Sequence, residues 1–324
     1  MRAGACLSLS GRFAAFGRQA ADGLRLWADQ DGVDLTVLDD ESDVKVLKQR
    51  LPGLAAEVDL LFGPYSTVLM RAAMEIAAEN RRLLFNHGGS GGRLDGGQVV
   101  NVLTPARRYA LPFVALLERT FYVPLFVATR RGAFGRDVVD GAVQAAEAKG
   151  RDVRAFEVDS PPTGVWNLLS AGVYEDDVAT VLAAQRLLTP PRLVCSVAAG
   201  VRDFGRDVET SDGVFGIGQW APGLNTSVDL GMDEPTFLAE WRRRFGAEPD
   251  YPAVQAYAAG LIAAASVRSA GSVDAERLWQ ELVTLDVRTV FGRFRLDPET
   301  GEQTGHESVL TLWRRGQQTL VPQT

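Results

Sequence analysis

The chain has 324 residues, of which 46% are hydrophobic, 23% charged and 8% aromatic. This composition is typical of a globular protein and excludes a disordered, collagen-like or disulfide-stapled chain. The net charge of −7 leaves no basic stripe for nucleic-acid phosphates. No apolar run reaches the roughly 18 residues that a membrane span requires. The length predicts two domains, each with its own core.

Short apolar runs, typical of buried strands, alternate with segments whose apolar residues recur every three or four positions, as in helices. We expect strands at residues 5–10, 33–39, 58–63, 82–88, 99–103, 123–129, 153–159, 192–200 and 214–220. Helices are expected at 18–30, 67–80, 107–120, 136–150 and 176–188, then at 236–246, 253–271 and 275–285, before a last strand at 308–313. This alternation predicts an α/β protein with doubly wound parallel sheets.

One short motif occurs twice. Ala15-Phe16-Gly17-Arg18 reappears as Ala133-Phe134-Gly135-Arg136, and each copy follows an expected strand and opens a helix. We interpret the two copies as equivalent turns of two similar lobes, with chance similarity as the alternative. Both turns then lie at the carboxyl ends of strands, where open α/β sheets bind ligands.

A glycine-rich loop follows the strand expected at 82–88. Its residues Gly88-Gly89-Ser90-Gly91-Gly92 match G-x-S-x-G, the nucleophile turn of serine hydrolases, with Ser90 as nucleophile and His306 as the downstream base. Residues 93–97 are a poor helix start, although that motif requires a helix there. We therefore favour a loop whose backbone N–H groups face a small polar ligand, and a serine hydrolase remains the alternative.

A second strand-end loop, Gly63-Pro64-Tyr65-Ser66-Thr67, precedes a strong helix. Ser66 or Thr67 can cap that helix and leave its first N–H groups as an anion site, although capping alone explains both residues equally well. Because the two loops follow strands of successive βα units, we expect them at one edge of the sheet. There they can hold the two oxygens of a carboxylate between hydroxyl and amide groups.

The order and spacing of these segments resemble the type I periplasmic binding proteins, in particular the Leu/Ile/Val-binding solute receptors of ABC importers. The resemblance is carried by GACLSLSGRFAAFG, LLFGPYST, RLLFNHGGS, FVATRRGAFGRDVVDG, GVFGIGQWAP and FGRFRLDPETGEQTGHESVLTLW. It implies two α/β lobes, joined by a hinge of three crossings, that close on a small ligand. The N-terminal lobe then comprises residues 1–120 and 248–304, and the C-terminal lobe residues 121–247 and 305–324.

The resemblance also implies which residues form the ligand site. The loop residues expected at the ligand's carboxylate are Tyr65, Ser66, Thr67, His87, Gly88, Gly89 and Ser90. The expected aromatic walls are Phe16, Phe134 and Tyr174, with Trp220 as a weaker candidate.

The sequence departs from the resemblance where amino-acid receptors bind an ammonium group. The two acids of that group correspond here to Ala106 and Ala199. Since a buried ammonium without a carboxylate partner is costly, we expect free amino acids to be poor ligands. A carboxylate or amide with an apolar or aromatic body should bind better, unless Glu175 or Asp176 points into the site. The segment 159–170 is also too short for a helix plus a strand, so we expect the C-terminal lobe to lack a helix there.

The expected function is that of a non-catalytic, extracytoplasmic solute-binding protein that delivers its ligand to the membrane permease of an ABC importer. We expect no cofactor or metal, because nucleotide motifs are missing from the sequence and it has only two histidines. A cytoplasmic small-molecule sensor of the same fold, acting on a protein partner, is the alternative. The N-terminal segment is not a signal peptide, so an extracytoplasmic location requires a signal sequence absent from this chain.

Overall fold

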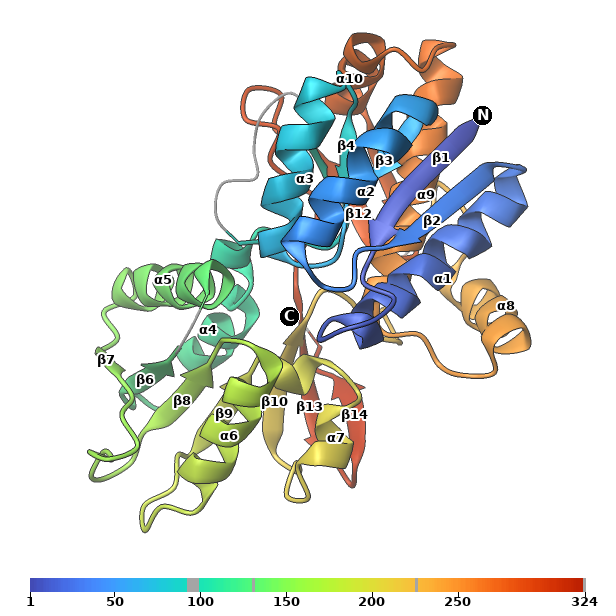
Figure 1. The fold of residues 1–324 in the computed structure, drawn as a ribbon. Helices are drawn as coiled ribbons and strands as arrows, with labels where there is room; N and C mark the ends of the chain where they lie inside the picture. The colour runs from blue at the N-terminus through green and yellow to red at the C-terminus, as the bar shows by residue number, and fades with distance from the viewer. Residues whose placement is uncertain (92–98, 130–131, 225–226, 323–324) are drawn as a thin grey trace. The chain divides into compact units, whose positions relative to one another are not determined.

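The computed structural model describes residues 1–91, 99–129, 132–224 and 227–322. The chain divides into two compact units, and each unit takes two separate segments of the chain. Unit 1 comprises Met1–Thr104 and Leu224–His306, and unit 2 comprises Pro105–Gly223 and Glu307–Thr324. Figure 1 shows the elements of both units, coloured by their place in the sequence.

Unit 1 is built on a parallel sheet of strand order β2-β1-β3-β4-β5. Its strands are β1 Arg2–Leu7, β2 Asp34–Asp39, β3 Leu60–Phe62, β4 Leu84–Asn86 and β5 Val99–Asn101. Its helices are α1 Ala14–Asp31, α2 Val44–Glu57, α3 Thr67–Glu79, α8 Glu234–Phe245, α9 Tyr251–Ala270 and α10 Ala275–Thr284. A hairpin of β11 Asp286–Thr289 and β12 Gly292–Arg295 completes the unit.

Alternating side chains of the unit 1 strands face two different helix layers. On one face, Cys6, Leu61 and Leu84 pack with the apolar residues of α2 and α3. On the other face, Phe62 contacts Phe85, with ring centroids 5.5 Å apart, and also Trp27 of α1, at 5.3 Å. Helix α9 packs along α1, so the sheet is covered on both faces, as the apolar runs of the strands predicted.

Unit 2 contains a mixed sheet of strand order β14-β13-β10-β9-β8-β6-β7. Its strands are β6 Leu125–Ala128, β7 Val153–Ala155, β8 Asn167–Ser170, β9 Leu193–Ser196, β10 Val214–Gly218, β13 Val309–Arg314 and β14 Gln317–Leu320. Its α-helices are α4 Leu111–Glu118, α5 Ala133–Glu147, α6 Tyr174–Gln185 and α7 Phe204–Asp207. Strand β13 pairs antiparallel with β10, so the end of the chain returns to unit 2 as the resemblance implied.

The connection from β7 to β8 contains no helix, which confirms the expectation for residues 159–170. Aromatic packing covers the strands instead. Trp166 stacks on Phe156 at 5.3 Å and meets the edge of Phe126 at 5.5 Å. The indole N–H of Trp166 donates to the carbonyl of Thr189, at 3.0 Å. Strand β8 itself, with the sequence NLLS, was not predicted.

The boundaries of the units differ from those expected from the sequence. Segment 105–120 belongs to unit 2, where Phe113 packs on Phe215 with ring centroids 6.0 Å apart. Segment 224–247 belongs to unit 1, where Phe237 of α8 packs on Tyr257 of α9 at 5.1 Å. The apolar faces of α4 and α8 decide these assignments, and their partners lie far along the chain.

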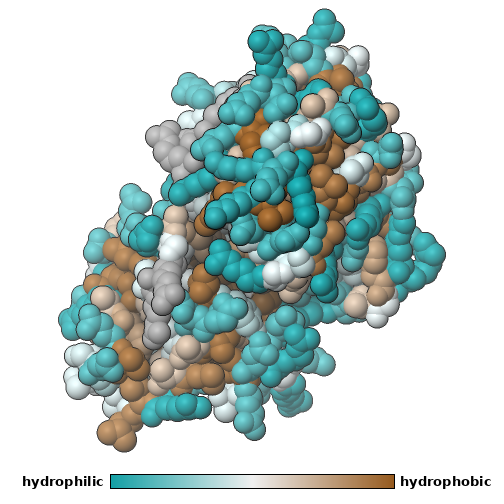
Figure 2. Space-filling model, viewed as in Figure 1, coloured by the Kyte–Doolittle hydropathy of each residue, from teal (hydrophilic) through white to brown (hydrophobic). Residues whose placement is uncertain are grey.

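Several large apolar side chains are exposed at the amino ends of the unit 2 strands. Phe121 and Tyr122 precede β6, Val165 precedes β8, and Leu188 precedes β9, with exposures from 62% to 104%. Figure 2 shows hydrophobic residues at this end of unit 2, at the lower left of the view. The helices in the described part of the chain include none long and apolar enough to cross a membrane.

Candidate functional site

The two predicted ligand loops of unit 1 lie against each other at the carboxyl ends of β3 and β4. The amide of Ser66 donates to the carbonyl of Gly88, at 3.1 Å, and the amide of Gly91 donates to the hydroxyl of Thr67, also at 3.1 Å. A Cβ atom at Gly88 would lie 2.6 Å from the Cα of Tyr65. The expected juxtaposition of the loops is therefore confirmed, and it requires glycine at position 88.

The hydroxyl groups at the start of α3 are arranged as hydrogen-bond donors. Ser66 Oγ accepts from the amide of Leu69, at 3.4 Å, and Thr67 Oγ1 accepts from Gly91. Each oxygen already accepts from the backbone, so its own proton is available for an acceptor. Ser66 also has φ 104°, a strained conformation for a residue with a side chain, and such strain is concentrated at functional sites. This arrangement suits an anionic group at the helix N-terminus.

Aromatic side chains form a wall beside these loops. The rings of Phe16 and Tyr65 are stacked, with centroids 4.9 Å apart and planes 5° from parallel. The hydroxyl of Tyr65 lies 2.7 Å from the hydroxyl of Tyr251, at the start of α9. Phe16 and Tyr65 were expected near one another, whereas Tyr251 was missed. Its only sequence signal is its place at the start of a helix, just before Pro252.

His87 follows β4 and is completely buried. Neither ring nitrogen has a hydrogen-bond partner among the described residues. Burial lowers the pKa of His87 to about 4, so the ring is neutral at physiological pH. A neutral imidazole offers one donor and one acceptor and adds no charge to the loops.

We expect the burial of His87 to make stability depend on pH. Because the folded state disfavours the charged ring, stability is fully present above the unfolded pKa of 6.5 and is lost as pH falls towards 4. The loss should reach about 3 kcal/mol relative to a His87→Phe variant, which cannot titrate. Urea unfolding of both proteins between pH 4 and 7 measures it. Parallel pH profiles for the two proteins would contradict the prediction.

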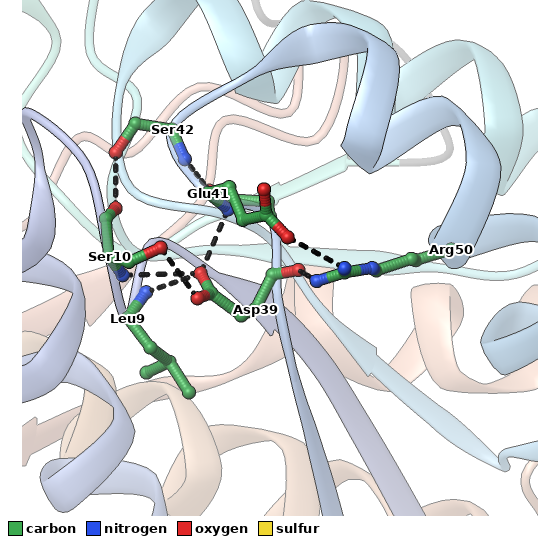
Figure 3. A network of polar contacts seen from close by, with 7 residues as sticks. Leu9, Ser10, Asp39, Glu41, Ser42 and Arg50 are labelled. Atoms are coloured by element: carbon green, nitrogen blue, oxygen red, sulfur yellow. Dashed lines mark hydrogen bonds and ion pairs between the residues drawn. The ribbon is translucent and has the colours of Figure 1, made fainter.

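The loop that precedes α1, the helix of Phe16, is fixed by Asp39 (Figure 3). The carboxylate of Asp39 accepts from the amides of Leu9, Ser10 and Glu41, at 2.9, 3.2 and 2.8 Å, and from the hydroxyl of Ser10, at 2.7 Å. Although partial burial opposes ionisation, these hydrogen bonds hold the pKa of Asp39 below its usual value. Arg50 bonds the carbonyl of Asp39 and the carboxylate of Glu41. The network joins the turns that follow β1 and β2.

The predicted site residues of unit 2 are placed within their own unit. Phe134 meets Tyr109 edge to face, with ring centroids 5.5 Å apart, and packs on the apolar core. Tyr174 donates its hydroxyl to Asp207, at 2.7 Å, and both burial and this carboxylate raise the pKa of Tyr174. Trp220 is only 2% exposed. Half-buried Phe134 and Tyr174 still present surface, whereas the ring of Trp220 presents almost none.

The positions expected to lack ammonium partners are apolar and buried. Ala106 and Ala199 lie in short 3-10 turns and are at most 1% exposed. Of the two possible replacement acids, Glu175 is exposed on α6. Asp176 places one carboxylate oxygen, Oδ2, in a buried position without a hydrogen-bond partner in the described residues. Of these two acids, Asp176 is therefore the one with a buried carboxylate oxygen that lacks a described partner.

His306, the histidine expected as the base for Ser90, has both ring nitrogens engaged elsewhere. In His306, Nδ1 lies 2.6 Å from the hydroxyl of Thr104 and Nε2 lies 3.1 Å from the carbonyl of Phe291. Both of its ring nitrogens are thus engaged in unit 1. The segment 93–97, expected to be a poor helix start, lies outside the described residues.

Some of the buried polar atoms without partners in the described part of the chain lie just after strands, and others lie in helices or at the start of β8. Among the described residues, those after strands include Oδ2 of Asp40 after β2, both ring nitrogens of His87 after β4, and Nε1 of Trp220 after β10. Folded proteins leave few buried polar groups unpaired, and the exceptions need an explanation.

Two α/β units with largely parallel sheets, each formed from two segments of the chain, define the fold of the type I periplasmic binding proteins. Residues 1–171, more than half of the chain, match the periplasmic binding protein family, and the chain belongs to this family.

Solved structures show the same fold at low sequence identity. The leucine-binding protein LivK of Thermotoga maritima matches with a TM-score of 0.82 and 15% identity, over 99% of this chain and 98% of that one. A solute-binding protein of an ABC transporter from Rhodopseudomonas palustris, in complex with 3,4-dihydroxybenzoic acid, matches with a TM-score of 0.81 and 13% identity, over 99% and 96%. A substrate-binding protein from Desulfitobacterium hafniense, in complex with Leu, matches with a TM-score of 0.81 and 14% identity, over 99% of both chains.

Proposed function

We propose that this protein is the extracytoplasmic solute-binding component of an ABC importer and that it carries its ligand to the membrane permease without catalysis. The main observation in support is the pair of hydroxyl donors, Ser66 and Thr67, at the N-terminus of α3 beside the stacked rings of Phe16 and Tyr65. This combination suits a ligand with an anionic end and a flat or apolar body. Closure of the two units on the ligand stays a prediction of the family resemblance.

The proposed ligand is a small carboxylate or amide with an apolar or aromatic body. Ala106 and Ala199 offer no charge to an ammonium group, and a buried ammonium needs one. One structural neighbour was solved with an aromatic carboxylate, 3,4-dihydroxybenzoic acid, which supports this class, whereas another was solved with the free amino acid Leu. Both ring nitrogens of His306, the expected base for Ser90, are engaged within unit 1. This supports a role for Ser90 other than that of a nucleophile.

A thermal-shift screen of ligand-stripped protein tests the proposal. The panel sets aromatic and aliphatic carboxylates and amides against free amino acids. A ligand at about 100 times its dissociation constant should stabilise the protein by about 2.7 kcal/mol, which raises Tm by several degrees. We expect carboxylates to raise Tm and amino acids to have no effect.

Three outcomes would change the proposal in different ways. A strong amino-acid response that Asp176→Asn removes would show that Asp176 binds an ammonium group, and the expectation of a lost ammonium site would be wrong. A complete panel without any response would contradict small-molecule capture. Steady hydrolysis of an activated ester that Ser90→Ala abolishes would favour the hydrolase alternative.

A further inference from the structure

Asp177 is the most completely buried carboxylate of unit 2, at 2% exposure in the first turn of α6. Its carboxylate accepts from the hydroxyls of Ser170 and Ser196, at 2.7 and 3.3 Å, and from the amide of Ala198, at 3.1 Å. Ser170 ends β8, and Ser196 ends β9. One side chain therefore ties together the ends of two neighbouring strands and the turn that follows the second of them.

The turn that carries Phe134 rests on the loop held by Asp177. A Cβ atom at Gly135 would lie 2.5 Å from the carbonyl oxygen of Ala171 and 3.1 Å from the Cα of Gly172. The backbone of α5 at Gly135 therefore packs directly on the backbone of the β8 loop, and a side chain at position 135 would push the two apart. The position of Phe134 thus depends on where the β8 loop is held.

In unit 1, an equivalent glycine, serine and buried aspartate hold Phe16. A Cβ atom at Gly17 would lie 2.1 Å from the carbonyl oxygen of Ser8, at the end of β1. The hydroxyl of Ser8 donates to the buried carboxylate of Asp40, at 2.6 Å, which also accepts from the amide of Ser42, at 2.8 Å. The Phe-Gly motif repeated in the sequence thus has a structural reason. In each unit its glycine packs on a strand-end backbone that a serine connects to a buried aspartate.

We propose that Asp177 and Asp40 are positioning residues that hold the strand-end loops, and with them Phe134 and Phe16, in the arrangement that receives the ligand. The role in ligand binding rests on the proposed function, whereas the role in loop order does not. Neither aspartate need touch the ligand. Replacement of either one should loosen the loops of its own unit only, because the hydrogen bonds described above stay within that unit.

The buried charge of Asp177 carries a pH signature. Burial raises its pKa to about 6, with hydrogen bonds from Ser170 and Ser196 opposing the rise. The titratable group that faces Asp177 is the thiol of Cys195 on β9, whose pKa is raised by burial and by Asp177. Glu175 and Asp176 lie beside Asp177 in the first turn of α6. Because the folded state binds the proton more tightly, the contribution of Asp177 to stability is greatest below pH 4 and is lost as pH rises to 6.

Hydrogen exchange of the ligand-free protein tests the proposal directly. Asp177→Ala should speed exchange of amides 171–173 and 197–199 by about tenfold or more and leave amides 9–13 and 41–43 unchanged. Asp40→Ala should give the reverse pattern. Asp177→Asn keeps the shape of the side chain but turns one of its two acceptor oxygens into a donor, so it should restore only part of the protection in unit 2. Asp140→Asn, at an exposed position of α5, is the matched control and should change neither set.

Uniformly faster exchange throughout unit 2, or no change at the named amides, would overturn the positioning role. As a second readout, the stability of wild type relative to Asp177→Asn should increase as pH falls from 7 to 5, and a flat difference would also overturn it. With any ligand found in the panel, Asp177→Ala should weaken affinity by about tenfold. If no ligand in the thermal-shift panel raises Tm, the proposed function is contradicted. The hydrogen-exchange result would still test whether Asp177 and Asp40 hold the loops.

Discussion

Replacement of Thr67 by valine should weaken binding of a carboxylate ligand by about 10- to 100-fold, because a hydrogen bond to a charged group contributes about 1.5–3 kcal/mol. Valine keeps the shape of threonine and removes only the hydroxyl, whose oxygen accepts from Gly91 at 3.1 Å. The proton of that hydroxyl is the group we expect to reach the ligand. Calorimetric titration with the strongest ligand from the thermal-shift panel measures the change.

Thr67→Ser is the matched control, since it keeps the hydroxyl and loses the methyl group. It should bind within a few-fold of wild type. Equal affinity of Thr67→Val and Thr67→Ser would show that the hydroxyl does not contact the ligand. Thr67 is the better position for this test because Ser66 has φ 104°, where any substitution also changes backbone strain.

Gly23→Val should destabilise unit 1 by about 3 kcal/mol or more, the upper range for overpacking. A Cβ atom at Gly23 of α1 would lie 2.1 Å from the carbonyl oxygen of Ala253 and 3.1 Å from the amide nitrogen of Tyr257, both in α9. Because the obstacles are helix backbone, the two helices must move apart and open the core between them. Urea unfolding monitored by circular dichroism measures the loss.

Gly53→Ala is the opposite case and serves as the control. Gly53 lies inside α2, and a Cβ atom there would meet nothing within 4 Å. The substitution should stabilise the protein by about 0.5–1 kcal/mol, because alanine loses less backbone entropy in a helix. A similar loss of stability in both variants would contradict the packing explanation.

Much of the fold could be predicted from hydrophobic periodicity. Every strand of unit 1's parallel sheet was expected within a few residues of its bounds, because buried parallel strands are continuous apolar runs between turn residues. Strands β8 and β14 were missed, and β14 is polar, with the sequence QQTL. The unit boundaries could not be fixed, because the partners of α4 and α8 are determined only by tertiary packing.

Only those parts of the site that lie next to recognisable strands in the sequence could be predicted. The loops at Ser66 and Gly88 follow recognisable strands, so their meeting at one edge followed from the βα order. Tyr251 and Asp177 were not predicted as contributors, because their roles depend on partners that periodicity does not reveal. The Tyr65–Tyr251 contact joins residues 186 positions apart. A buried aspartate at a helix start resembles any acidic N-terminal residue until its neighbours are known.

The interleaving of the two units has a consequence for synthesis. Unit 1 has its parallel sheet by Asn101, yet α9, which covers that sheet with α1, ends only at Ala270. Unit 2 needs β13, at Val309–Arg314, between β10 and β14. Neither unit can complete its core until most of the chain has been translated. The nascent polypeptide therefore exposes the face of the unit 1 sheet that α9 covers until that helix has been translated.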